Sequence, residues 1–121
     1  MNSGAARRAR QKAIQADLTK AYSDEEAAPP EWLDLFNTVR DETASVREAV
    51  AAETERFVSE TDIRAALARR DRFARATGER VEAVNRTIKR LNLIAPHARF
   101  TRAALNVDEV LRPLFRAARS R

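Results

Sequence analysis

Apolar and small side chains recur between residues 32 and 57 in alternating steps of four and three. This spacing places them on one face of an α-helix, as a heptad seam. Pro29 and Pro30 precede the seam, and proline is favoured at the first positions of a helix. Glu53 stands where the seam is interrupted. We expect a helix whose buried face consists of Trp32, Phe36, Val39, Thr43, Val46, Val50 and Phe57.

A second seam with the same alternation runs from residue 63 to residue 91. Between the seams lies a polar break in which Ser59 or Thr61 can cap the next helix, with Asp62 at its positive end. Two matched seams joined by a tight turn predict an antiparallel helical hairpin over residues 30–92. The second buried face is expected to contain Ile63, Leu67, Arg70, Ala74, Thr77, Val81, Val84, Ile88 and Leu91.

The segments that flank the hairpin predict two shorter helices. Residues 5–22 are rich in alanine and carry three apolar side chains on one helical face, Ile14, Leu18 and Tyr22. After the hairpin, Pro96 should end the second long helix near Asn92, with an extended connector over residues 93–104. We expect Asn85 to hydrogen-bond to this connector and Asn92 to satisfy polar groups left free at the end of its own helix.

The last helix should begin at a cap on Asn106, with Glu109 completing a capping box and Pro113 kinking the second turn. The predicted fold is therefore all-α: a long antiparallel two-helix hairpin with a short amino-terminal helix and a carboxy-terminal capping helix. Residues 1–27 form a basic helical arm and an acidic linker, and residues 28–121 form the hairpin domain with its terminal helix.

Charge divides the chain into three blocks. Residues 1–22 hold five basic and one acidic side chain. Residues 23–62 hold three basic and twelve acidic side chains, and residues 63–121 hold fifteen basic and five acidic side chains. Opposite charges on the two long helices can therefore pair across the hairpin, each exposed pair contributing roughly 0–1 kcal/mol. Within the second seam, either packing is loose at Arg70 or Arg70 reaches an acidic side chain opposite.

Several kinds of site are excluded by composition. The chain has no cysteine, one histidine (His97) and two glycines (Gly4 and Gly78). These counts exclude thiolate zinc sites, a cluster of histidines and a glycine-rich phosphate loop. Any catalytic arrangement that needs a histidine, such as Ser-His-Asp, would have to use His97. No apolar run approaches the roughly 20 residues that span a bilayer. We expect no enzyme activity, no catalytic residue, no cofactor and no metal, with His97 as a surface or packing residue.

The candidate contact residues are basic or aromatic. Basic side chains off the seams can meet RNA phosphates or acidic protein, and those of the amino-terminal arm can also meet an anionic membrane surface; the sequence leaves these partners open. The candidates for this contact are Arg7, Arg8, Arg10, Lys12, Arg86, Lys89 and Arg90. The candidates for docking on protein are Trp32, Phe36, Leu114 and Phe115, although Trp32 is also placed for core packing.

Two stretches carry a resemblance to a known family. The first is Ala28-Pro29-Pro30-Glu31-Trp32-Leu33, followed by a charged helix. The second is Val84-Asn85-Arg86-Thr87-Ile88-Lys89-Arg90-Leu91-Asn92-Leu93-Ile94-Ala95-Pro96, followed by Phe100 and a terminal helix. Together they resemble the conserved domain of DnaJ homologue subfamily C member 28, over roughly residues 28–118. The family's J domain, with its His-Pro-Asp tripeptide, and its upstream glycine-rich segment are missing.

The resemblance implies a helical interaction module, with eukaryotic members associated with mitochondria, and no catalytic residues. The basic, nearly acid-free segment 1–22 is also similar to a mitochondrial transit peptide, and we expect it to be retained and held by a partner. The function expected is that of an accessory subunit of a large assembly on the matrix side of mitochondria. The mitochondrial ribosome is favoured, with rRNA as a possible partner. A respiratory-chain or ATP-synthase complex and a co-chaperone-related adaptor or assembly factor are the alternatives.

Overall fold

The computed structural model describes residues 29–97 and 100–120. Within them the regular structure is helical: α3 covers Pro30–Ser59, α4 covers Ile63–Ile94 and α5 covers Val107–Arg119. The predicted all-α class is confirmed for these residues, and so are the two long packed helices and the carboxy-terminal helix. The helix predicted over residues 5–22 lies outside the described residues.

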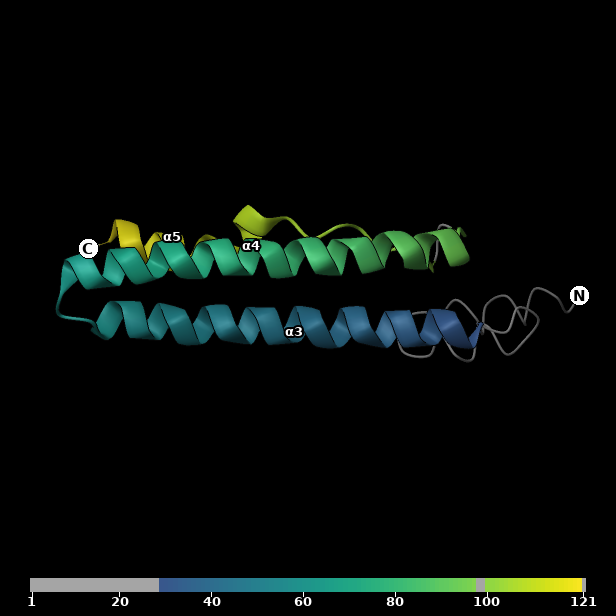
Figure 1. The fold of residues 1–121 in the computed structure, drawn as a ribbon, viewed down its shortest axis with the longest axis horizontal. Coiled ribbons are helices and arrows are strands. Elements are labelled where there is room, and N and C mark those ends of the chain that lie inside the picture. Colours follow the sequence, from purple (N-terminus) through teal and green to yellow (C-terminus); the bar gives the residue numbers. More distant parts are fainter. Residues whose placement is uncertain (1–28, 98–99, 121) are drawn as a thin grey trace, which may run out of the picture.

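The two long helices lie side by side and run in opposite directions (Figure 1). Contacts between them show the register, because the residue number on α4 falls as the number on α3 rises. Glu42 pairs with Arg80, and Glu53 pairs with Arg69. α5 packs back against this pair toward the end where α3 and α4 are joined, and the connector leads to it along α4 (Figure 1).

Within the described residues, three apolar clusters hold the helices together. At the open end of the helix pair, Trp32 packs with Leu91, Ala95 and Phe100. The middle cluster consists of Val39, Val84 and Ile88. The cluster at the joined end receives side chains from all three helices: Val46, Val50, Phe57, Ala66, Val81, Val110, Leu111 and Leu114. The core therefore depends on α5 at one end and on the connector at the other.

The seam of α4 departs from the prediction in its first turns. Ile63 is 42% exposed, whereas Ala66 is fully buried. The buried face has shifted because α5 adds its own apolar side chains at this end, and a small alanine lets the neighbouring helices approach. Of the two alternatives left open for Arg70, the reach to an acidic side chain opposite is not the one observed, since Arg70 binds its neighbour Asp71 at 2.8 Å.

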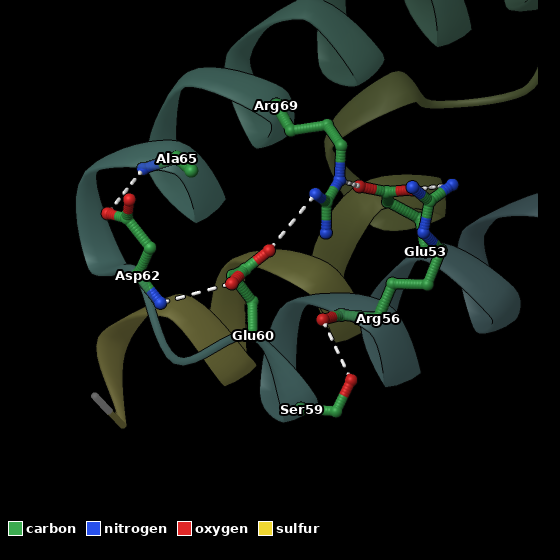
Figure 2. A network of polar contacts seen from close by, with 7 residues as sticks. All are labelled: Glu53, Arg56, Ser59, Glu60, Asp62, Ala65 and Arg69. Carbon is green, nitrogen blue, oxygen red and sulfur yellow. Dashed lines mark hydrogen bonds and ion pairs between the residues drawn. The ribbon is translucent and has the colours of Figure 1, made fainter.

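The turn between the long helices is capped by Asp62 rather than by Ser59 or Thr61. The Asp62 carboxylate accepts a hydrogen bond from the Ala65 amide at 3.1 Å, whereas the Ser59 hydroxyl donates to the Arg56 carbonyl (Figure 2). Glu60 accepts a bond from the Asp62 amide. This bond, the largest cause, holds the pKa of the half-buried Glu60 carboxyl below its ordinary value.

Arg69 ties the turn to the body of α3. Its Nε donates to Glu53 at 3.2 Å and its Nη1 donates to Glu60 at 3.4 Å (Figure 2). Glu53, the residue that interrupts the first seam, is only 6% exposed. A carboxylate this buried requires a cationic partner, which explains how a charged residue occupies a core position.

The ends of the later helices differ slightly from the prediction. α4 continues beyond Asn92 to Ile94, because only Ala95, the residue before Pro96, is driven out of the helical conformation. The Asn106 cap is confirmed, since its side chain accepts hydrogen bonds from the Asp108 and Glu109 amides. α5 continues through Pro113 to Arg119.

We predict that Arg69→Met lowers the free energy of unfolding by about 2–4 kcal/mol, because it leaves the buried Glu53 carboxylate without its main partner. The double variant Glu53→Met/Arg69→Met should regain most of that loss, since two apolar side chains replace the pair. Arg80→Met is the matched control: its pair with Glu42 is exposed and should contribute less than about 1 kcal/mol. Urea titration followed by circular dichroism measures all three. Equal losses for Arg69→Met and Arg80→Met would contradict the account.

Candidate binding surfaces

Two asparagines of α4 bind, in the same way, the connector that runs between the end of α4 and the start of α5. The Asn85 side chain donates to the Leu105 carbonyl at 3.1 Å and accepts from the Leu105 amide at 2.7 Å. The Asn92 side chain donates to the Arg102 carbonyl at 2.9 Å and accepts from the Arg102 amide at 2.8 Å. Each carboxamide therefore satisfies both polar groups of one backbone residue, as a neighbouring strand would.

We call the paired hydrogen bonds of Asn85 and Asn92 the two asparagine clamps, and simple geometry explains their spacing. Asn85 and Asn92 are seven residues apart, which is about 10.5 Å along an α-helix. Arg102 and Leu105 are three residues apart, which is about 10 Å in an extended chain. Because the two lengths agree, the connector lies along α4 without slack. The prediction that Asn85 binds the connector is confirmed, whereas Asn92 reaches the connector rather than the polar groups at its own helix end.

Arg102 links the connector to the aromatic residues of α3. Its guanidinium lies over the Phe36 ring, 4.6 Å from the centroid. Phe36 in turn stacks on Trp32 with a centroid separation of 5.1 Å, and Phe100 meets Trp32 edge-on. Burial lowers the pKa of Arg102, yet an arginine keeps its charge at neutral pH. The half-buried Arg102 is therefore a cation fixed at the surface, and sequence reasoning missed it because its position depends on Asn92.

The structure revises the predicted protein-docking residues. Trp32 and Leu114 are fully buried within the chain's own core, so neither presents a surface to a partner. The reason is the connector and α5, which cover them from the side that a two-helix hairpin alone would leave open. Phe36 and Phe115 are half-buried at the surface, and they remain candidates for docking. The core-packing alternative for Trp32 is the one observed.

The predicted basic contact residues divide into two groups. Arg7, Arg8, Arg10 and Lys12 lie outside the described residues. Arg86, Lys89 and Arg90 are all exposed on α4, at positions i, i+3 and i+4 of one surface. No acidic side chain among residues 29–97 and 100–120 lies within ion-pair distance of them. Pairing with the acidic helix α3 is instead made by Arg69 and Arg80.

The other features singled out in the sequence are the single histidine, possible metal ligands and apolar stretches. His97 is exposed and meets Phe100 edge-on, as expected of a packing residue. Within residues 29–97 and 100–120, acidic, histidine and cysteine side chains do not gather in threes around any point where a metal could bind. The described helices also lack the long apolar stretch that would be needed to cross a bilayer.

Comparisons with protein-family models, with curated proteins and with solved structures found no match for this chain. The protein's function is therefore inferred from the geometry of its surfaces.

We predict that Asn85→Ala and Asn92→Ala each lower the free energy of unfolding by about 1–3 kcal/mol, because each leaves a backbone amide and carbonyl of the connector without partners. Thr87→Ala is the control. Thr87 lies between the two asparagines, and its hydroxyl donates only to the Ala83 carbonyl of its own helix. Its effect on the free energy of unfolding, obtained from urea titration, should stay within about 0.5 kcal/mol. If all three variants unfolded at the same urea concentration, the clamps would contribute nothing to stability.

Proposed function

We propose that this chain is a non-enzymatic accessory subunit of a large ribonucleoprotein assembly, the mitochondrial ribosome being our first candidate. Its antiparallel hairpin would serve as the rigid scaffold, and the basic cluster Arg86, Lys89 and Arg90 would contact RNA. The observation that carries the proposal is that these three cations are exposed together without an acidic partner among the described residues. The mitochondrial setting follows from the family resemblance and stays a prediction.

The chemistry of the cluster suits phosphate. Residues three and four apart on a helix project from one surface about 5–6 Å from one another. Two of the three are arginines, whose planar guanidinium groups can donate two parallel hydrogen bonds to a phosphate. Contacts of this kind are independent of base sequence and weaken with salt as counterions are released. The cluster therefore favours recognition of an RNA backbone over reading of bases.

The position of the cluster also supports this proposal. Asn85 and Asn92 hold the connector to α4 on either side of the cluster, and Ile88 and Leu91 bury the same turns in the core. The three cations thus stand on backbone fixed by packing and by hydrogen bonds. Less conformational freedom is lost when a ligand binds to such a surface than to a mobile tail.

We predict that the variant Arg86→Gln/Lys89→Gln/Arg90→Gln binds a fluorescent RNA hairpin of arbitrary sequence about tenfold or more weakly, because three phosphate contacts are lost. The slope of log affinity against log salt should fall by up to about three. Fluorescence anisotropy over a series of KCl concentrations measures both quantities.

The control for this experiment removes the same charge from another surface. Arg112, Arg116 and Arg119 are exposed on α5, and replacing all three with Gln changes the net charge equally. This variant should keep most of the affinity. Equal losses in the two triple variants would show that only net charge matters and would contradict a binding surface on α4. Unchanged affinity in both would contradict RNA binding by the described part of the chain.

A further inference from the structure

A groove lies between α3 and the connector, with α4 at its base. Val39 of α3, Ile88 of α4 and Leu105 of the connector line its floor, which exposes mainly carbon atoms. Its volume is about 440 Å³, which falls within the roughly 300–1,000 Å³ of sites that hold small molecules. Because the asparagine clamps hold the connector, both walls of the groove are fixed.

The rim of the groove is cationic. Arg40 and Arg47 border it from α3 and Arg102 borders it from the connector, and no carboxylate is found among the described residues that line it. Arg47 also borders a second hollow, and the lining of that hollow includes Glu109. A carboxylate near Arg47 repels an anion there. The favourable place for an anionic group is therefore the other end of the groove, at Arg40 and Arg102.

Arg40 and Arg102 stand beside the same aromatic ring. The Arg102 guanidinium lies over Phe36 at 4.6 Å and donates to the Thr101 carbonyl at 3.2 Å, and it forms no ion pair with a described residue. Arg40 follows Phe36 by four residues, so its side chain leans over the same turn. Its Nε contacts the Asp41 carboxylate at 3.1 Å, an exposed pair that leaves both terminal nitrogens for another anion.

We propose that this groove binds an anionic amphiphile, a molecule with one unbranched apolar chain and a carboxylate or phosphate head. The head lies between Arg40 and Arg102, whose guanidinium groups can each donate two parallel hydrogen bonds to either kind of head. The chain lies along the apolar floor toward Arg47. The lengths agree, since the α3 wall from Phe36 to Arg47 covers about 16 Å. One acyl chain covers about 15 Å, half of the roughly 30 Å hydrocarbon core of a bilayer.

The charge of the head is the property that separates this ligand from others. A neutral or cationic amphiphile would cover the floor equally well, but it would leave Arg40 and Arg102 without a counter-charge. The groove shares no residue with the basic cluster Arg86, Lys89 and Arg90, so the inference does not rest on the proposed function.

Isothermal titration calorimetry on the full chain tests the proposal. The probes are dodecanoate, dodecyl phosphate and dodecyltrimethylammonium, each kept below the concentration at which it forms micelles. We expect both anions to bind at least about tenfold more tightly than the cation with the same chain. Octanoate should bind more weakly than dodecanoate, by up to about fourfold for each CH₂ removed. Whichever anion binds more tightly identifies the head group. Equal affinities for the anions and the cation would overturn the proposal.

Two charge variants place the head. Arg40→Gln/Arg102→Gln should weaken dodecanoate binding at least about tenfold, because the charge-assisted hydrogen bonds are lost. The clamp at this position persists in the variant, since Asn92 binds the backbone of residue 102 rather than its side chain. The matched control, Arg112→Gln/Arg116→Gln, removes the same charge from exposed positions of α5 and should change the affinity less than about twofold. Equal losses in the two variants would show attraction by net charge alone and would contradict the site.

Two size variants place the chain. Ala44→Trp fills the groove from an exposed position of its α3 wall and should abolish dodecanoate binding. Ala83→Trp adds the same side chain at an exposed position that lines a different hollow, and it should leave binding unchanged. Circular dichroism should show the same helix content in both. Binding that survives Ala44→Trp would overturn the proposal. A protein that binds no probe and sediments as a dimer, which Ala44→Trp dissociates, would overturn it in favour of a second copy in the groove.

Discussion

The position of the connector, and with it that of α5, requires two lengths to match. Seven residues of α-helix and three residues of extended chain both cover about 10 Å, so Asn85 and Asn92 can hold Leu105 and Arg102 at once. A two-helix hairpin in which so many apolar residues are alanine has little apolar surface to bury. The clamped connector supplies additional apolar surface, because it brings Phe100 onto Trp32 and places α5 at the joined end of the hairpin.

The same clamps determine which side chains are available to partners. Because the connector and α5 cover one side of the helix pair, Trp32 and Leu114 become core residues, and Phe36 becomes the platform for Arg102. The cover is incomplete along α3, and the groove that remains has an apolar floor and an arginine-rich rim. On α4, the basic cluster stands between the two asparagines, outside the core. Packing and recognition thus use different faces of the same few turns.

Sequence periodicity was a good guide where burial alone decides the structure. Most of the seam of α3, apart from the half-buried Phe36 and Thr43, and the later seam of α4, from Thr77 to Leu91, are buried as the spacing predicts. It was a poor guide where α5 intervenes, as at Ile63 and Ala66, because a third element changes which face is inside. Arg69 could not be chosen over Arg70 as the partner of Glu53, since the choice depends on helix rotation. The hydrogen bonds of Asn85 could be anticipated, but the fixed position of Arg102 could not.

Amide exchange in the unmodified protein measures directly whether Asn85 and Asn92 hold the connector against α4. The connector from Thr101 to Asn106 is not helical, so its amides would exchange rapidly without specific partners. Our account predicts that the Arg102 and Leu105 amides exchange about a hundredfold or more slowly than those of Ala103 and Ala104 between them. Nuclear magnetic resonance resolves the four signals individually. Uniformly fast exchange across all four residues would show that the asparagine clamps do not hold the connector.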